Sequence, residues 1–284
     1  MSDKTEPDSS MSSSPAGGLK DARAFIFDMD GVLYRGKTPL PGVQTLFDAL
    51  TIRGIRFLLA TNNSMATPAA YVIRMAEMGV TVAENDIQTS ATATRDYLLD
   101  LLPPDATILI VGMPALGEQI FTGTGFRPAT DDPSETIDAV VVGLDLAFTY
   151  EKLYRATRAI HLGAQFIATN ADATLPTETG FQPGAGSIVA AIATATGAVP
   201  TVVGKPETLM MMKGIQQLGV DPSQAVMVGD RLDTDILSGH NAGLSTVLVL
   251  TGVSQRADFD QATVLPDYVF TDLPALTQAI VSDG

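Results

Sequence analysis

Short apolar runs recur along this chain and are separated by longer segments of mixed polarity. The runs are AFIF at 24–27, RFLLA at 56–60, TILIVG at 107–112, DAVVVG at 138–143, QFIATN at 165–170, AVMV at 225–228 and STVLVL at 245–250. Runs that are apolar on nearly every residue are typical of strands covered on both faces, as in a parallel sheet between helices. The pattern therefore predicts several buried, parallel strands.

Segments of helical length lie between these runs. They cover residues 68–79, 91–102, 150–162, 186–196, 206–218 and 233–242. Glycine, which tolerates a positive φ angle, stands where five of these helices would end, at Gly79, Gly163, Gly197, Gly219 and Gly243. Strands that alternate with helices in this way predict an α/β protein.

The chain is acidic, with 32 Asp and Glu against 17 Lys and Arg and a net charge of −15 over 284 residues. Because this charge repels phosphate backbones and anionic lipids, we expect neither nucleic acid nor a membrane surface as partner. The absence of cysteine excludes disulfides, thiolate zinc sites and thiol catalysis. No apolar run approaches the ~18 residues that span a bilayer, and the Ser-rich residues 1–19 lack the apolar stretch of a signal peptide. We therefore expect a cytoplasmic protein with a disordered tail at residues 1–19.

Polar side chains follow four of the apolar runs directly. Asp28 and Asp30 follow the first run, and Asp230, Asp233 and Asp235 follow the run at 225–228. The run at 56–60 leads into Thr61, Asn62, Asn63 and Ser64, and a strand TVVG at 201–204 leads into Lys205. Since an open α/β sheet binds its ligand at the carboxyl ends of its strands, we expect these groups to meet.

Several carboxylates brought together repel one another unless a cation or a proton separates them. Oxygen ligands without histidine or cysteine favour a hard cation such as Mg²⁺. A lysine and a loop of hydroxyl and amide groups beside them would complete an anion pocket. One DxD pair alone is more often a turn or a helix cap. Four polar clusters, each after an apolar strand, instead predict a Mg²⁺-assisted phosphate site.

These motifs resemble those of the haloacid dehalogenase superfamily, in particular its NagD-like, p-nitrophenyl-phosphatase branch of subfamily IIA. The matching segments are FDMDGVLYRG, TNNS, GKPE and VGDRLDTDI, and the resemblance covers roughly residues 22–281. It implies a Rossmann-like parallel core sheet with a large inserted α/β cap domain. It also implies a phosphatase that acts on a small phosphorylated metabolite.

The resemblance implies a role for each strand-end group. Asp28 would be the nucleophile that forms an aspartyl-phosphate, and Asp30 would protonate the leaving oxygen and then draw a proton from water. Mg²⁺ would be held by Asp28, the main-chain oxygen of Asp30 and Asp230, with Asp235 orienting a water on the metal. Asp233 would be structural or would cap the following helix.

The phosphate would be held by groups around the second and third motifs. Thr61 would bind phosphate oxygens together with main-chain amides at Asn62 and Asn63 and at Gly31, which follows Asp30. Lys205 would neutralise charge on the phosphoryl group in flight.

Spacing locates the cap. Asp28 and Thr61 are 33 positions apart, which leaves room only for a loop, a helix and a strand, whereas Thr61 and Lys205 are 144 apart. We therefore expect a core at residues 20–103 and 200–284 and a cap at 104–199. Asn170 and Asp172, in a stretch similar to the family's cap loop, are candidates to face the substrate, although a turn explains them almost as well. Many members of the family have Pro where this chain has Ala171.

The sequence disfavours three alternative functions. Residues 31–38 match the P-loop pattern of an NTP-dependent enzyme, but Pro39 and Pro41 disfavour the helix that a P-loop requires, and an exposed flap is expected instead. A non-catalytic binding module would need one of the four clusters to lack a reactive group, and none does. A phosphomutase would carry its cap between the first two motifs.

The leaving group is not determined by the motifs. A nucleoside monophosphate such as UMP, or p-nitrophenyl phosphate, is the expected substrate, and phosphoglycolate, pyridoxal phosphate and glycerol phosphate are the alternatives. Because relatives associate through the cap, the resemblance also leaves a homodimer open.

Overall fold

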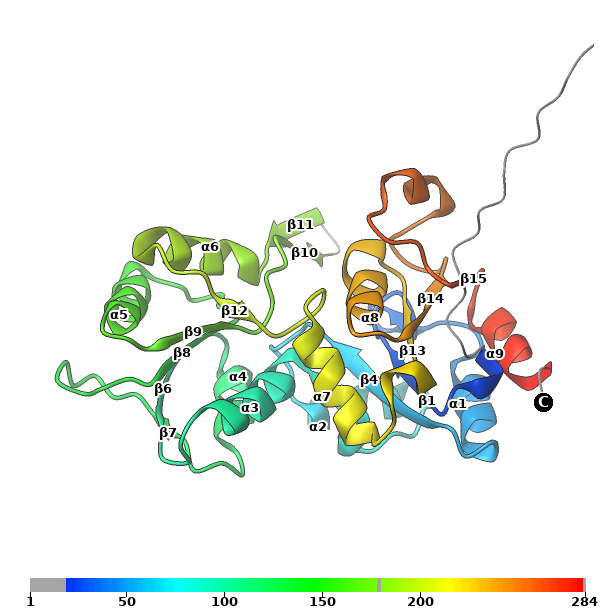
Figure 1. Cartoon of the computed structure of the whole chain (residues 1–284), viewed down its shortest axis with the longest axis horizontal. Coiled ribbons are helices and arrows are strands. Elements are labelled where there is room, and N and C mark those ends of the chain that lie inside the picture. The colour runs from blue at the N-terminus through cyan, green and yellow to red at the C-terminus, as the bar shows by residue number, and fades with distance from the viewer. Residues whose placement is uncertain (1–18, 178–179, 283–284) are drawn as a thin grey trace, which may run out of the picture.

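Six parallel strands form the largest sheet in the computed structural model, which describes residues 19–177 and 180–282 (Figure 1). The strand order is β15-β14-β13-β1-β4-β5. Their bounds are β1 (Ala24–Phe27), β4 (Arg56–Thr61), β5 (Ile87–Thr89), β13 (Ala225–Gly229), β14 (Ser245–Val249) and β15 (Tyr268–Phe270). All five pairings are parallel, which confirms the prediction from the apolar runs.

Helices cover both faces of this sheet, because its strands are apolar on both sides. On one face, Phe25 and Phe27 of β1 pack with the apolar residues of three helices: α1 (Val43–Ile52), α2 (Pro68–Glu77) and α9 (Leu273–Ser282). On the other face, Ile26 and Met227 lie in an apolar cluster with residues of α3 (Ser90–Leu101) and α7 (Thr208–Leu218), while α8 (Leu237–Asn241) packs beside α7. The result is the three-layer α/β architecture predicted from the sequence.

A second, five-stranded parallel sheet is built from the chain between β5 and α7 (Figure 1). Its order is β12-β9-β8-β6-β7, with bounds β6 (Thr107–Val111), β7 (Arg127–Pro128), β8 (Ala139–Val142), β9 (Gln165–Ala168) and β12 (Thr201–Val202). Helices α5 (Tyr150–His161) and α6 (Ala185–Thr196) cover one face, and α4 (Pro114–Phe121) and α3 cover the other. Since α3 and α7 share one apolar cluster with both sheets, the two sheets are packed together.

The strand expected at 201–204 differs from the prediction in length and in the sheet that it joins. It is only two residues long and pairs with β9 in the second sheet, so it is not a strand of the core sheet. The tail predicted for residues 1–19 lies outside the described residues except for Leu19, which is buried and begins a 3-10 helix (Leu19–Asp21). That prediction was therefore wrong at its last residue.

The core sheet has one topological switch point. From β1 the chain moves to β4 and β5 on one side, and after the second sheet it returns to β13, β14 and β15 on the other. The switch point therefore lies between β1 and β13, which pair directly. In open α/β sheets the ligand crevice lies outside the carboxyl ends of the strands at this point.

A short hairpin, β2 (Tyr34–Arg35) and β3 (Thr38–Pro39), occupies the segment that matches the P-loop pattern. Lys37 and Thr38 are exposed in it, and the next helix begins only at Val43. The P-loop alternative is therefore wrong and the expected flap is confirmed. Between β1 and β4 the chain forms only this hairpin and α1, so the phosphomutase type of cap is absent as well.

All six predicted helices are present, the last one opening as a π-helical turn (Leu232–Ile236) before α8. The five glycines expected at helix ends have φ angles between 59° and 107°. Helix α1 is the helix for which the spacing between Asp28 and Thr61 left room, whereas α4, α9 and the short strands β5 and β15 were not predicted. A second hairpin, β10 (Thr174–Thr177) and β11 (Gly180–Pro183), precedes α6. None of the helices in the described part of the chain is long and apolar enough to cross a bilayer.

Candidate active site

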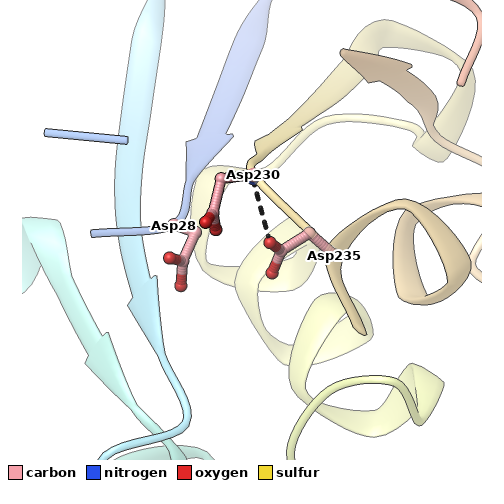
Figure 2. Close-up of side chains that lie close together, drawn as sticks. All are labelled: Asp28, Asp230 and Asp235. Atoms are coloured by element: carbon pink, nitrogen blue, oxygen red, sulfur yellow. Dashed lines mark hydrogen bonds between the residues drawn. The ribbon is translucent and has the colours of Figure 1, made fainter. Parts of the chain in front are cut away.

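Three carboxylates meet at the switch point of the core sheet. Asp28 follows β1, Asp230 follows β13, and Asp235 lies in the π-helical turn after it (Figure 2). Each offers an oxygen, and these oxygens lie within 4.8 Å of one another. Neighbouring parallel strands therefore deliver Asp28 and Asp230 to one edge, as the sequence predicted.

Main-chain groups hold the two carboxylates after β13 in place. The Asp235 Oδ2 accepts hydrogen bonds from the amides of Asp230 (3.2 Å) and Arg231 (3.1 Å), and the first of these is drawn in Figure 2. The Asp230 Oδ2 accepts from the amide of Val253 at 2.7 Å. Asp230 and Asp235 are both buried, so their orientation is set by the fold rather than by solvent.

Lys205 places its ammonium among these carboxylates. Its Nζ lies 2.5 Å from Asp28 Oδ1 and 2.8 Å from Asp235 Oδ1, and it donates to the main-chain oxygen of Ala60 at 3.2 Å. The lysine side chain is 3% exposed. A buried ammonium with three oxygen partners is fully hydrogen-bonded, because –NH₃⁺ has three donors.

The electrostatics of the cluster follow from burial. Burial raises the pKa of Asp28 to about 7, with the Lys205 charge opposing the shift and Asp235 adding to it. Burial, together with repulsion from Asp235 and Asp28, raises the pKa of Asp230 to about 8. The pKa of Lys205 is raised overall, because the two carboxylates outweigh the burial that lowers it. One ammonium therefore does not balance three carboxylates.

A divalent cation fits this site. The donors within reach are oxygens of Asp28, Asp230 and Asp235, which suit Mg²⁺ better than a softer metal. Burial first, and repulsion between the carboxylates after it, raise the pKa values of Asp28 and Asp230, so a divalent cation bound among them would favour their ionised forms. The acidic cluster is therefore a candidate Mg²⁺ site.

Asp30 and Gly31 form the turn after Asp28. The Asp30 side chain is exposed, yet the protein around its carboxyl still removes enough water to raise its pKa, while Arg74 and Arg35 oppose the shift. Gly31 has a φ angle of +86°, and a Cβ on it would lie 2.5 Å from Asp230 Oδ2. Glycine is required here because the main chain passes directly against the Asp230 carboxylate.

Thr61 and Asn63 lie at the carboxyl end of β4. The Thr61 Oγ1 accepts from the amide of Asn63 at 3.2 Å, and the Asn63 Oδ1 accepts from the amide of Met65 at 2.8 Å. The hydroxyls of Thr61 and Tyr71 are hydrogen-bonded, and burial raises the pKa of Tyr71 to about 12, so this phenol stays neutral. The side chains of Thr61 and Asn63 thus shape a local loop beside the carboxylates.

Asn62 contacts both Lys205 and the loop after β9. Its side chain contacts the main chain of Lys205 and the carboxylate of Asp172. Its main-chain oxygen accepts from Asn170 Nδ2 at 2.8 Å. The loop after β9, with Asn170 buried and Asp172 half-buried, is therefore brought to the site as predicted. Burial raises the pKa of Asp172, against the hydrogen bond from Asn62.

Arg231 and Asp233 form a pair beside the site. The Arg231 Nε and Nη2 donate to the Asp233 carboxylate at 3.1 and 2.8 Å, and this exposed pair lowers the pKa of Asp233. Asp233 is directed to Arg231 rather than to the three-carboxylate cluster. This placement agrees with the structural role expected for it.

Sequence reasoning missed the loop after β14. Thr251 Oγ1 donates to the Gly31 main-chain oxygen at 2.7 Å, and the amide of Ser254 donates to the Asp230 main-chain oxygen at 2.9 Å. Gly252 packs so closely that a Cβ on it would lie 1.8 Å from Asp230 Oδ2. The only signal was the TG pair directly after an apolar strand. Tyr71, on an apolar helix face, gave no signal that separated it from core residues.

Two cavities lie near the core sheet. The smaller, about 80 Å³, is lined by Asn62, Asn63 and Asp172 and by apolar side chains that include Met65, Leu144 and Leu175. The larger, about 1060 Å³, lies at the amino end of β4 beside Arg56 and Lys213 and contacts none of the predicted catalytic residues. The smaller cavity therefore contacts residues predicted to bind the substrate, but none of the three carboxylates.

Comparison with known proteins agrees with this geometry. A model of haloacid dehalogenase-like hydrolases matches residues 25–127, and a HAD-hydrolase-like model matches residues 202–276. An acid sugar phosphatase of Staphylococcus aureus is 40% identical over 255 residues, which are 90% of this chain and 96% of the relative.

Two solved structures are similar over nearly their whole length. A p-nitrophenyl phosphatase from Archaeoglobus fulgidus is 32% identical, with a TM-score of 0.85 over 91% of this chain and 99% of the other. A 4-nitrophenylphosphatase from Thermotoga maritima is 36% identical, with a TM-score of 0.85 over 92% and 98% of the two chains.

The chain belongs to the haloacid dehalogenase-like hydrolases, as the four motifs implied. Within that family it is an enzyme of the phosphatase class, similar to the p-nitrophenyl phosphatases of the NagD-like branch. The resemblance on which the site residues were assigned is thereby confirmed at the level of family, fold and enzyme class.

Proposed function

We propose that this protein hydrolyses small phosphate monoesters with Mg²⁺ through an aspartyl-phosphate at Asp28. The observation that carries the proposal is the position of the Asp28 carboxylate. It lies at the switch point, bonded to Lys205 and within 4.8 Å of oxygens of Asp230 and Asp235. A nucleophilic carboxylate beside a fixed positive charge suits attack on a phosphate dianion.

Two displacements at phosphorus make up the reaction. In the first, an oxygen of Asp28 bonds to phosphorus, the ester P–O bond breaks, and Asp30 gives a proton to the leaving oxygen. In the second, Asp30 takes a proton from water, the water oxygen bonds to phosphorus, and the bond to Asp28 breaks. Asp30 suits both roles because it is exposed and its raised pKa lies nearer to neutrality than that of an ordinary aspartate.

The remaining groups stabilise charge on the phosphoryl group. Lys205, which is ion-paired with Asp28 and Asp235, would neutralise charge on this group, and its oxygens would be bound by Thr61 and by the main-chain amides of Asn62, Asn63 and Gly31. Mg²⁺ would be held by Asp28, Asp230, Asp235 and the main-chain oxygen of Asp30. When bound, it would reduce the repulsion between the Asp28 carboxylate and the phosphate.

The leaving group would extend toward the cavity beside Asn62 and Asp172. The apolar side chains of this cavity and the Asp172 carboxylate would offer the leaving group apolar contact and a hydrogen-bond acceptor. Substrates proposed for test are a nucleoside monophosphate such as UMP and p-nitrophenyl phosphate, then phosphoglycolate, pyridoxal phosphate and glycerol phosphate. The Staphylococcus aureus relative's description as an acid sugar phosphatase adds sugar phosphates to this panel. A homodimer and a cytoplasmic location stay predictions.

The test is phosphate release from this panel by the wild-type protein with Mg²⁺ and with EDTA, beside the Asp28→Asn variant. We expect release that requires the metal and is lost in Asp28→Asn. Undiminished activity in EDTA, or turnover by Asp28→Asn, would contradict the proposal.

A further inference from the structure

The Asn62 side chain makes a two-point contact with the main chain of Lys205. Its Oδ1 accepts from the Lys205 amide at 2.8 Å, and its Nδ2 donates to the Lys205 main-chain oxygen at 2.8 Å. These two bonds fix which end of the amide is oxygen and which is nitrogen, because the partners are a donor and an acceptor of one residue. Asn62 therefore pairs with Lys205 as a neighbouring strand would.

Lys205 needs such a contact because the chain reaches it from the second sheet. The amides of Val203 and Gly204 donate to the main-chain oxygens of Ala168 and Thr169, which continues the pairing of β12 with β9. The partner of the lysine side chain, Asp28, instead follows β1 of the core sheet. If the second sheet moved relative to the core sheet, Lys205 would move with it and away from Asp28. A contact between the Lys205 main chain and the core sheet would prevent this.

The packing around Gly204 leaves room for this contact only when residue 204 has no side chain. A Cβ on Gly204 would lie 2.5 Å from the Thr169 main-chain oxygen and 2.6 Å from Asn62 Oδ1. The close approach of Asn62 to Lys205 therefore depends on a glycine at position 204.

The same asparagine contacts the loop that faces the small cavity. Its Nδ2 donates to Asp172 Oδ2 at 3.2 Å, and its main-chain oxygen accepts from Asn170 Nδ2 and from Ser90 Oγ at 2.8 and 2.7 Å. One Nδ2 group thus serves both the Lys205 main chain and the Asp172 carboxylate, since it carries two hydrogens.

We propose that Asn62 is a positioning residue that fixes Lys205 to the core sheet and links it to the Asp172 loop, in addition to any main-chain contact with phosphate. The inference rests on the proposed function, because Lys205 must face the phosphoryl group for its position to matter. Asn62 acts through Lys205, so its loss should affect the reacting complex more than the binding of a small ester.

The experiment compares Asn62→Ala, Asn62→Ser, Asn62→Asp, Asp172→Asn and the double variant Asn62→Asp/Asp172→Asn, with p-nitrophenyl phosphate and saturating Mg²⁺. We expect Asn62→Ala and Asn62→Ser to lower kcat by about 10²-fold with a much smaller rise in KM, as a misplaced catalytic group does. Asp172→Asn alone is the reference for the double variant: its side-chain oxygen still accepts from Asn62, and a change in its KM would report the contact with substrate proposed for Asp172.

The double variant tests the link between the two loops. Asn62→Asp places a second carboxylate against Asp172, so it should be the least active single variant. Asp172→Asn in that background restores a donor opposite the new carboxylate and should recover kcat by about tenfold, the effect of a hydrogen bond to a charged group. Asn85→Asp, an exposed change far from the site, controls for added negative charge and should match the wild type.

The outcomes separate this inference from the proposed function. If position-62 variants keep the wild-type kcat while Asp28→Asn is inactive, Asn62 has no positioning role and the proposed function stands. Loss of activity in Asn62→Asp without recovery in the double variant would refute the link to Asp172. If the wild-type protein hydrolyses no ester with Mg²⁺, the proposed function itself fails.

Discussion

Replacing Gly252 by alanine should disable the acidic cluster although no residue with a proposed catalytic or metal-binding role is replaced. A Cβ at this position would lie 1.8 Å from Asp230 Oδ2, 2.3 Å from its Cγ and 2.4 Å from its Cβ. Because such contacts do not fall below 3.0 Å, the carboxylate must move by at least about 1.2 Å. Asp230 has little room to do so, since it is buried and the Gly31 main chain passes so close that a Cβ there would also lie 2.5 Å from its Oδ2.

The size of the effect follows from this displacement. A shift of about 1 Å in a group that orders a reaction costs on the order of 10²-fold in rate. The overpacking itself costs about 1–3 kcal/mol of stability. We therefore expect Gly252→Ala to fold, to lose about 10²-fold in kcat, and to need more Mg²⁺ for half-maximal activity.

The matched control is Gly117→Ala. Gly117 lies within α4, and a Cβ there would meet its nearest neighbour, Phe121, at 3.8 Å, an ordinary contact. Alanine in a helix interior should stabilise the protein by roughly 0.5–1 kcal/mol without changing turnover. The assays are p-nitrophenyl phosphate hydrolysis over a Mg²⁺ titration and thermal melting in EDTA. Equal kcat and equal Mg²⁺ dependence for the two variants would refute the packing argument.

Two further predictions concern the charges of the cluster. Lys205→Met should abolish phosphate release. It should also lower the free energy of unfolding in EDTA by about 3–5 kcal/mol, because it leaves the Asp28 and Asp235 carboxylates without their buried partner. An unchanged midpoint in denaturant unfolding would contradict this. The pKa values of Asp28 and Asp230 in the folded protein, about 7 and about 8, are higher than the ordinary 3.8. Protonation of these two groups therefore stabilises the folded state. This stabilisation is complete below about pH 4 and is lost as the pH rises through the two folded pKa values. Melting in EDTA should therefore occur at lower temperature at about pH 8.5 than at about pH 6, with a larger rise on adding Mg²⁺ at the higher pH; a Mg²⁺ shift independent of pH would count against the coupling.

Much of the core sheet could be predicted because its strands are buried on both faces. A run such as AFIF identifies β1 from four residues, and the aspartates after it then fall at the sheet edge. The pairing of β1 with β13 could not be predicted from local pattern, because nearly 200 positions separate them. Asp28 and Asp230 could still be expected to meet, because each directly follows an apolar strand and ligand sites lie at the carboxyl ends of such strands.

The parts that were missed depend on contacts between distant segments. The strand before Lys205 has only two residues, so its apolar pattern could not tell which sheet it joins. Gly252 is important because it has no Cβ and therefore leaves space for the Asp230 carboxylate, and no sequence pattern reveals that these two residues are in contact. The main-chain amide of Asn62 was expected to bind phosphate, and no role was predicted for its side chain, which contacts Lys205 and Asp172.

The most direct measurement is a search for phosphate on the protein during turnover. The wild-type enzyme with p-nitrophenyl phosphate and Mg²⁺ would be quenched in acid, digested and examined by mass spectrometry. Phosphate on the peptide that contains Asp28, absent in Asp28→Asn and in EDTA, is the predicted result. Rapid turnover with phosphate on another residue, or hydrolysis by Asp28→Asn, would contradict the account.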